Sequence, residues 1–229
     1  MARGLLIAGA ALLLFRAGAA AAEPGRFYAG GDPKRKAVAL TFDDGPGRYT
    51  PDVLRVLDES GVKATFFVTG GNAERRPGLV REILRRGHEL GDHTYGHVNF
   101  RSVEKEKGVE AAKAAVEEEM RRSHRILVSI SSAPPSFCRM PHGYDRKWLG
   151  AVAAKFGYSL VNWTFGEDWA GLPEAKMLED YRRALVPGAI LLFHDGGAGR
   201  EKTLAILPEV IREARQRNLS IVTVGELLK

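Results

Sequence analysis

The sequence contains little cysteine, few aromatic residues and no low-complexity tract. Cys138 is the only cysteine among 229 residues, which excludes an intrachain disulfide framework. Hydrophobic residues make up 45% of the chain, which excludes wholesale disorder. No internal repeat or linker divides the sequence, and α/β barrels of about 200 to 250 residues fold as one unit. These features predict one globular domain.

Basic residues are in excess, but they form no cluster with aromatic residues. The formal net charge is +6 and the pI is about 9.5. Nucleic-acid-binding proteins gather such charge on one face, often with aromatic side chains between the basic ones. Two arginines, Arg3 and Arg16, lie in an N-terminal segment that we expect to be removed, which lowers the charge from +6 to +4. We therefore expect no nucleic-acid partner.

One apolar run is long enough to need an explanation, and it lies at the N-terminus. Residues 1–22 begin with basic Arg3, continue with an apolar run over 5–15 and end in alanines before Glu23. This order is typical of a secretory signal peptide. The run is shorter than the roughly 20 residues of a membrane-spanning helix. We expect cleavage near Glu23, no integral membrane segment afterwards, and a secreted, periplasmic or cell-wall-associated protein; an uncleaved signal anchor is the alternative.

From residue 37 onward, short β-branched or aromatic runs alternate with longer stretches that have helical apolar spacing. Strands are predicted at 37–42, 64–68, 89–92, 136–139, 159–163, 189–193 and 220–224. Helices are predicted at 51–60, 77–86, 103–124, 147–156, 174–185 and 203–217. This alternation favours parallel strands, because a right-handed crossover needs a dozen or more residues. We predict an α/β fold, a distorted (β/α)7-type barrel in a single domain; an open doubly wound sheet is the competing arrangement.

Polar residues follow five of the predicted strands. In chain order they are Asp43 and Asp44, His93 and His97, Arg139 and His142, Asp168 and Trp169, and His194 and Asp195. Taken alone, paired aspartates are typical of a turn or a helix N-cap, and a histidine pair is typical of a surface. The carboxyl ends of parallel strands meet at one rim, however, so the combination predicts a functional site.

Imidazoles and carboxylates together predict a metal site at that rim. His93 and His97 face the same way if their segment coils as a helical turn, and imidazole with carboxylate is a usual ligand set for zinc. Two histidines and one aspartate leave coordination positions open, as in catalytic sites. A second carboxylate, Asp43, can accept a proton from water, and His194 can protonate a leaving group. The inventory predicts hydrolysis.

Five segments occur in the order of one enzyme family. They are TFDDGP at 41–46, HTYGH at 93–97, RMPHG at 139–143, DW at 168–169 and LLFHD at 191–195. The chain from residue 36 to 229 thereby resembles the polysaccharide deacetylases, the NodB-type domains of carbohydrate esterase family 4. The resemblance implies a distorted (β/α) barrel and a metal-dependent hydrolase of linear amides. Its substrate would be a polysaccharide containing N-acetylhexosamine, such as peptidoglycan, a chitin-like polymer or an exopolysaccharide.

Two other functions remain open at this point. Some members of the family remove O-acetyl groups from xylan, so an esterase acting on a glycan is the first alternative. The second alternative is a glycan-binding barrel without activity. The residues named above argue against it, because such a chain should have lost the base or the metal ligands.

The resemblance also implies individual roles. Asp43 would be the general base, and Asp44, His93 and His97 would hold a divalent metal, zinc. His194 would be the general acid.

Five further residues would support this machinery. Arg139 would orient the base, and Asp168 would support either Arg139 or His194. Trp169 and Leu192 would line the pocket for the acetyl methyl group, and the backbone N–H of His142 would stabilise the oxyanion.

Two positions depart from the family pattern. His142 stands where the family usually has Tyr or Phe, which leaves a backbone donor intact but puts a stacking role in doubt. In the fourth motif, the spacing from Trp163 to the Asp-Trp pair is one residue short, with Gly166 where another aspartate is common. We expect buried, structural roles for Cys138 and His88.

Overall fold

The computed structural model describes residues 23–229, so the predicted signal peptide at 1–22 lies outside the described residues. Eight strands form one sheet in the order β1-β6-β5-β4-β3-β2-β7, with β8 paired to β2, and every pairing is parallel. Their bounds are β1 Phe27–Tyr28, β2 Ala37–Asp43, β3 Thr65–Val68, β4 Glu89–Asp92, β5 Phe137–Cys138, β6 Ser159–Val161, β7 Ile190–His194 and β8 Ser220–Val222.

The chain that follows β6 closes the sheet onto β7. Thr164 N–H donates to the carbonyl of Ile190 at 2.9 Å, and Leu192 N–H donates to the carbonyl of Phe165 at 2.8 Å. These bonds link β7, at one end of the strand order, to the extension of β6, next to the other end. The sheet is therefore curved into a distorted barrel, and the prediction of a single parallel α/β domain is confirmed.

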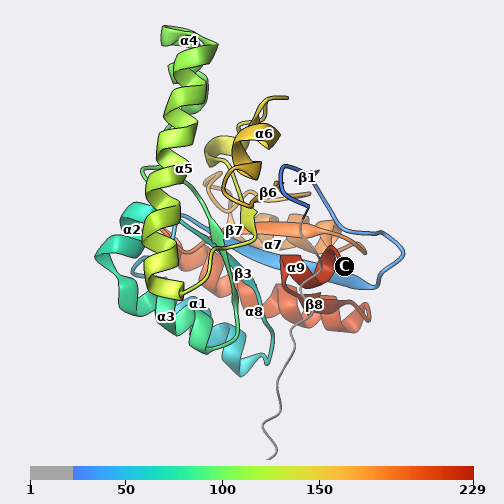
Figure 1. Cartoon of the computed structure of the whole chain (residues 1–229). Helices are drawn as coiled ribbons and strands as arrows, with labels where there is room; N and C mark the ends of the chain where they lie inside the picture. The colour runs from blue at the N-terminus through green and yellow to red at the C-terminus, as the bar shows by residue number, and fades with distance from the viewer. Residues whose placement is uncertain (1–22) are drawn as a thin grey trace, which may run out of the picture.

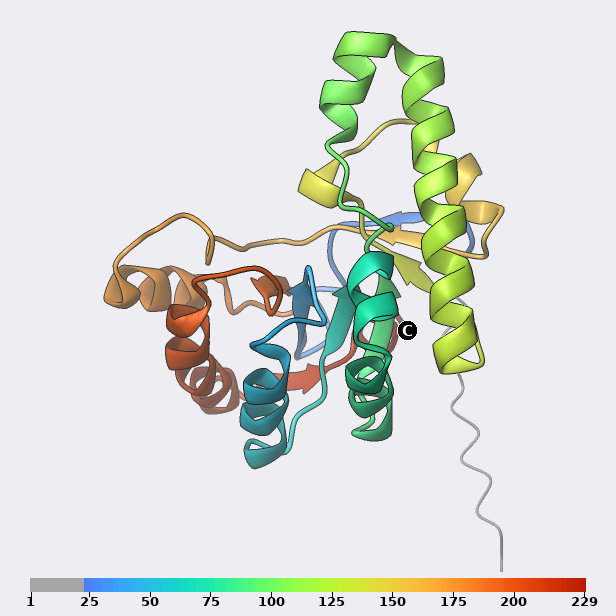
Figure 2. The ribbon, with the colours of Figure 1, turned by 90° about the vertical axis from the view of Figure 1, so that its left-hand side faces the viewer.

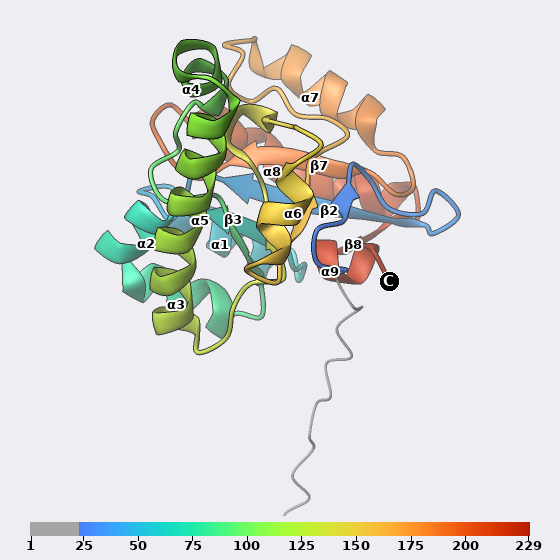
Figure 3. The ribbon, with the colours of Figure 1, turned by 45° about the horizontal axis from the view of Figure 1, so that its top comes forward.

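Helices surround the strands, with α5 on one side of the molecule and α7 on another (Figures 1 and 3). Their bounds are α1 Thr50–Glu59, α2 Gly70–Arg75, α3 Pro77–Arg85, α4 Phe100–Lys107, α5 Val109–Ser131, α6 Leu149–Ala154, α7 Glu174–Ala184, α8 Glu201–Gln216 and α9 Val224–Leu227, with a 3₁₀ turn, η1, at Pro141–Gly143. Within residues 23–229, no helix has the length and apolar character needed to cross a membrane.

The helix predicted at 103–124 is wrong as a single element. The structure has two helices there, α4 and α5, which meet at Gly108. Gly108 has φ +86° and ψ 169°, a conformation that glycine adopts far more readily than other residues and that interrupts the helix. The two helices form a hairpin that extends beyond the sheet (Figure 2). The long helix α5 then continues to Ser131, past the predicted end.

Strand β2 lies at the centre of the core and ends at the first of the two candidate aspartates, Asp43. All of its residues are buried, and it pairs with β3, β7 and β8. The ring of Phe42 stacks against the rings of Phe66 on β3 and Phe193 on β7, with centroids 5.1 and 5.7 Å away. This packing fixes the register that sets Asp43 beside His194 at the carboxyl ends of β2 and β7.

Candidate active site

A cavity of about 440 Å³ opens at the carboxyl ends of the strands. Its lining comes from the carboxyl ends of β2 and β7 and from the segments that follow β2, β4, β5, β6 and β7. The lining residues are Asp43, Asp44, His93, His97, Met140, His142, Trp163, Trp169, Leu192, His194 and Arg200. All but Arg139 and Asp168 of the ten predicted site residues are in this lining, and those two are buried directly behind it.

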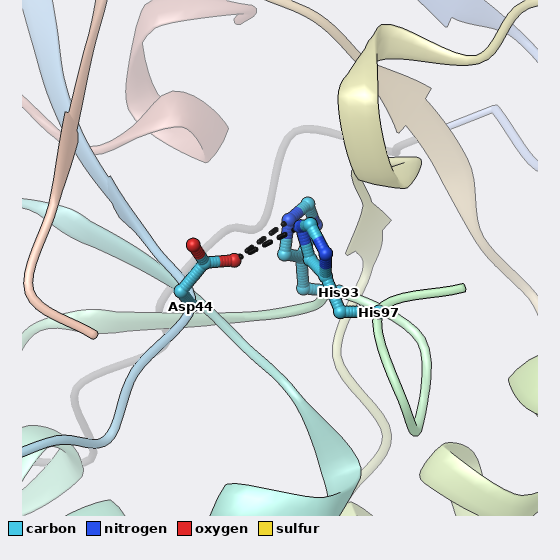
Figure 4. Close-up of side chains that lie close together, drawn as sticks. All are labelled: Asp44, His93 and His97. Carbon is cyan, nitrogen blue, oxygen red and sulfur yellow. Dashed lines mark ion pairs between the residues drawn. The ribbon is translucent and has the colours of Figure 1, made fainter. Parts of the chain in front are cut away.

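Three of the lining side chains form a possible metal site. Asp44 Oδ1 lies 3.1 Å from His97 Nε2 and 3.5 Å from His93 Nε2, and one ligand atom from each residue fits within 4.8 Å of the others. Figure 4 shows both imidazoles turned toward the carboxylate of Asp44. The structure therefore brings together the three residues expected to hold a metal.

The backbone reaches this arrangement through left-handed residues rather than a helical turn. Asp44, Thr94 and His97 have φ values of 67°, 61° and 55°. The segment from His93 to His97 contains no helix, so the expected helical turn is wrong. The two imidazole rings still converge, with centroids 5.0 Å apart.

The donor atoms of this cluster fit a divalent cation. His93 Nδ1 lies 2.7 Å from the carbonyl of Arg139, so Nδ1 carries the proton and Nε2 presents its lone pair. Asp44 Oδ1 is buried and accepts no well-aligned hydrogen bond within the described chain. Burial opposes ionisation of Asp44, but His93 and His97 outweigh it and hold the pKa of Asp44 well below its usual value. An ionised carboxylate and two imidazoles are ordinary ligands of zinc.

Asp43 is held by a buried arginine. The Arg139 guanidinium is completely buried and donates to Asp43 Oδ1 at 2.8 Å and to Thr41 Oγ1 at 2.8 Å. It also donates to the backbone carbonyls of Val161 and Asn162, at 3.2 and 3.1 Å. The second oxygen of Asp43 stays 3.7 Å from His93 Nε2, beside the metal cluster. Arg139 thus fixes the orientation of Asp43, as the resemblance implies.

Asp168 supports His194, which settles a question that the sequence left open. Asp168 Oδ1 lies 2.7 Å from His194 Nδ1, and Oδ2 accepts from the backbone N–H of His194 at 2.9 Å and from Thr203 Oγ1 at 2.8 Å. Arg139 makes no contact of this kind with Asp168. Burial lowers the pKa of His194, but the bond to Asp168 and the charges of Asp43 and Asp44 outweigh burial and raise it.

The remaining predicted residues form the walls of the cavity. Leu192 is buried to 2% exposure, whereas Trp169 is 50% exposed and its ring centroid is 5.2 Å from that of His194. His142 has φ 56°, and its ring meets the ring of His97 edge-on at 4.6 Å. In turn η1 the N–H groups of Gly143 and Tyr144 are bonded, whereas that of His142 has no backbone acceptor within residues 23–229.

Three lining residues were missed by the sequence analysis. Met140 and Trp163 each lie close behind the end of a strand, separated from it by a single residue, and that position was the available signal. Arg200 ends the loop between β7 and α8, after a glycine-rich segment, and its distance from the end of the strand left no signal in the sequence. Cys138 and His88 lie outside the cavity, in buried structural positions.

Fold and site together define a parallel α/β barrel with a possible metal cluster, a carboxylate and an imidazole at one rim. Residues 30–161 match the family model described as polysaccharide deacetylase. A peptidoglycan-N-acetylglucosamine deacetylase of Bacillus cereus is 33% identical over 198 residues, covering 85% of this chain and 89% of the relative. A chitooligosaccharide deacetylase of Bradyrhizobium is 32% identical over 206 residues, covering 84% and 90%.

A solved structure shares the architecture over most of the chain. The peptidoglycan N-acetylglucosamine deacetylase in complex with 4-naphthalen-1-yl-N-oxidanyl-benzamide has a TM-score of 0.81 and 28% identity, covering 88% of this chain and 92% of that chain. The chain belongs to the polysaccharide deacetylase family. The predicted family and enzyme class are thereby confirmed.

Proposed function

We propose that the protein is a metal-dependent hydrolase that removes N-acetyl groups from an N-acetylhexosamine-containing polysaccharide. The observation that carries this proposal is the convergence of Asp43, the Asp44–His93–His97 cluster and His194 in one cavity. Relatives named for peptidoglycan and chitooligosaccharide deacetylation support an acetylated amino-sugar polymer as substrate.

Asp44, His93 and His97 would hold the metal, for which zinc is our proposal. Two imidazoles and one carboxylate form one of the three-ligand sets found at catalytic zinc sites. A bound divalent cation supplies Lewis acidity, which polarises a carbonyl oxygen and lowers the pKa of water.

Asp43 and His194 divide the proton transfers between them. Asp43, oriented by Arg139, accepts a proton from the attacking water. His194, with its pKa raised and Nδ1 engaged by Asp168, presents Nε2 and donates a proton to the departing amine nitrogen. Without that proton an amine is a poor leaving group, so the reaction needs both residues.

The walls of the cavity complete the site. The His142 N–H, which has no backbone acceptor within residues 23–229, would stabilise negative charge on the acetyl oxygen. Leu192 and Trp169 give the methyl group an apolar surface on the His194 side.

Acetate release from defined N-acetylated oligosaccharides tests the proposal. Removing the metal with a chelator should abolish release, and adding zinc should restore it. Full activity in the chelated protein would overturn the metal-dependent mechanism. Binding of the glycan without release of acetate from any substrate would support a binding barrel instead.

Replacement of Asp43 separates the base from the metal site. Asp43→Asn should lower kcat by about 100- to 10,000-fold, the usual contribution of a general base, because Asn cannot accept the proton. The variant should still bind zinc, which metal analysis of the purified protein measures. Asp44→Asn is the matched control, since it should lose zinc affinity. Equal zinc loss in both variants would contradict this division of roles.

We also propose that the protein is exported. The order of residues 1–22 supports this proposal, and the short apolar run favours cleavage over retention as an anchor. Mass spectrometry of the protein from the extracytoplasmic fraction should find a chain that begins near Glu23. An intact N-terminus in a membrane fraction would instead indicate an anchor.

A further inference from the structure

Arg200 stands between the catalytic cavity and a second, smaller cavity. It lines the catalytic cavity of about 440 Å³ and a neighbouring one of about 170 Å³. Trp169 is the other side chain that lines both. The two cavities therefore adjoin at Trp169 and Arg200.

The guanidinium of Arg200 is held by a hydrogen bond but has no ion-pair partner among residues 23–229. Its Nε donates to the carbonyl of Gly196 at 3.0 Å, and no carboxylate within residues 23–229 lies at ion-pair distance from it. Arg139, the other arginine at this site, is by contrast paired to Asp43. Arg200 is half-buried, so its unpaired charge is held at the rim of the cavity rather than in open solvent.

The loop that carries Arg200 is built to hold it in place. Gly199 N–H donates to Tyr49 Oη at 3.2 Å, and the carbonyl of Arg200 accepts from Leu204 N–H at 3.0 Å in the first turn of α8. A guanidinium fixed at its backbone and at Nε loses little freedom when its two terminal nitrogens bind a ligand.

The second cavity has the charge to receive an anion. Lys202 lines it beside Arg200. Asp168 is its one lining carboxylate among the described residues, and both Asp168 oxygens are already engaged by His194 and Thr203. A guanidinium presents two parallel N–H groups that match the two oxygens of a carboxylate.

We propose that Arg200 and the second cavity form a subsite for a carboxylate on the sugar next to the one that is deacetylated. This inference rests on the proposed function and narrows its substrate class to acidic N-acetylhexosamine glycans. Arg200 acts by binding substrate and takes no part in proton transfer, so its contribution should appear in KM rather than in kcat.

A matched pair of substrates isolates the carboxylate. One is a glycan strand of alternating N-acetylglucosamine and N-acetylmuramic acid with the lactyl carboxylate free. The other is the same strand with that carboxylate converted to its methyl amide. The zinc-loaded protein should prefer the acid over the amide in kcat/KM by about tenfold, the size expected for one charge-assisted hydrogen bond.

Variants at position 200 assign that preference. Arg200→Gln should bring the ratio of kcat/KM for the acid to that for the amide close to one, by raising KM for the acid. Arg200→Lys should retain part of the preference, because lysine keeps the charge but lacks the two parallel N–H groups of the guanidinium. Arg81→Gln is the matched control, because it removes the same charge from the exposed face of α3, outside both cavities. A ratio unchanged by Arg200→Gln, or lowered equally by Arg81→Gln, would overturn the proposal.

Binding measurements keep this test independent of catalysis. In an Asp43→Asn background, calorimetric Kd values for the two strands should show the same preference, and adding Arg200→Gln should remove it. If the protein releases no acetate from either strand, the proposed function fails, and the Kd ratio alone decides the role of Arg200. Equal Kd values for the acid and the amide, or no binding of either, would refute the subsite.

Discussion

At the scale of single residues, two buried carboxylates each pair with a basic side chain: Asp43 with Arg139, and Asp168 with His194. Arg139 is permanently charged and completely buried, so it requires a buried counter-charge, which Asp43 provides. His194 can gain and lose its proton, and Asp168 raises its pKa by stabilising the protonated ring. One pair therefore orients the proposed base, and the other favours the protonated form of the proposed acid.

Replacing Asp168 should change the pH dependence of the reaction. His194 must be protonated to act as the acid, so kcat/KM falls as the pH rises through its pKa. Asp168→Asn removes the negative charge that raises this pKa, so the alkaline limb of the profile should move to lower pH. Above neutral pH, kcat/KM should fall by about ten- to a hundredfold.

The control for this prediction removes a different partner of the Asp168 carboxylate, the hydroxyl of Thr203. Thr203→Val removes a hydrogen bond to Asp168 Oδ2 without changing any charge, so it should leave the alkaline limb close to its original position. Profiles of kcat/KM against pH measure both variants. An alkaline limb that stays in place in Asp168→Asn would show that another group limits activity there.

The sequence predicted most of the residues that line the cavity but not all of their partners. The motifs placed Asp43, His93 and His194 at strand ends, and parallel strands bring those ends together. The partner of Asp168 depends on the chain after β6, which folds back against β7 through Phe165. That contact is long-range, and no local pattern encodes it.

At the scale of elements, helix α4 supports the turn that carries His142. Arg101 on α4 donates from Nη1 to the carbonyl of His142 at 2.6 Å and from Nη2 to that of Gly143 at 3.0 Å. These two hydrogen bonds stabilise a turn whose central residue, His142, has a left-handed φ of 56°. A residue outside the five motifs thus positions the proposed oxyanion donor.

Arg101→Met should therefore impair catalysis more than binding or stability. The variant loses both bonds to the turn, so the His142 N–H should be less well placed and kcat should fall by about ten- to a hundredfold, somewhat less than deletion of an oxyanion donor. Arg101→Lys should recover part of the loss. Steady-state kinetics and the melting temperature measure these effects.

Arg125→Met serves as the control for Arg101. Arg125 is an exposed arginine on α5, away from the turn, and its replacement should leave kcat unchanged. If Arg101→Met lowered the melting temperature strongly but left kcat intact, Arg101 would have only a structural role.

Element boundaries were the less predictable part of the fold. Helical spacing continues on both sides of Gly108, so the pattern alone indicated one helix where α4 and α5 are separate. Strand β1 spans Phe27–Tyr28 and depends on its pairing with β6. Such short elements follow from tertiary contacts rather than from local periodicity.

At the scale of the whole molecule, β2 organises both core and site. It pairs with β3, β7 and β8, and its register with β7 sets Asp43 beside His194. The ring of Phe42 stacks against aromatic rings on β3 and β7. Stability of the barrel and geometry of the site therefore depend on the same central strand. Alternation of strand and helix was sufficient to predict parallel strands with right-handed crossovers, but it left an open doubly wound sheet as the alternative to a barrel. The contact of Phe165 with Leu191, which closes the barrel, is long-range and has no local signal in the sequence.

His88 links the stability of this barrel to pH. It is buried before β4, its Nδ1 accepts from Ala64 N–H at 3.2 Å, and its Nε2 has no partner within residues 23–229. Burial, aided by the charge of Lys63, lowers the pKa of His88 to about 4 from its ordinary 6.5. The folded protein therefore holds His88 neutral where the unfolded chain already binds a proton.

The free energy of unfolding should consequently fall as the pH drops from about 6.5 to about 4, and His88 should contribute about 2 kcal/mol to that fall. His88→Asn places an amide oxygen where Nδ1 accepts from Ala64 N–H but cannot be protonated, so it should weaken the pH dependence. Urea unfolding of both proteins at about pH 7 and about pH 4.5 measures the difference, since the other histidines titrate equally in both. A variant that lost the same free energy at both pH values would show that His88 contributes by packing alone.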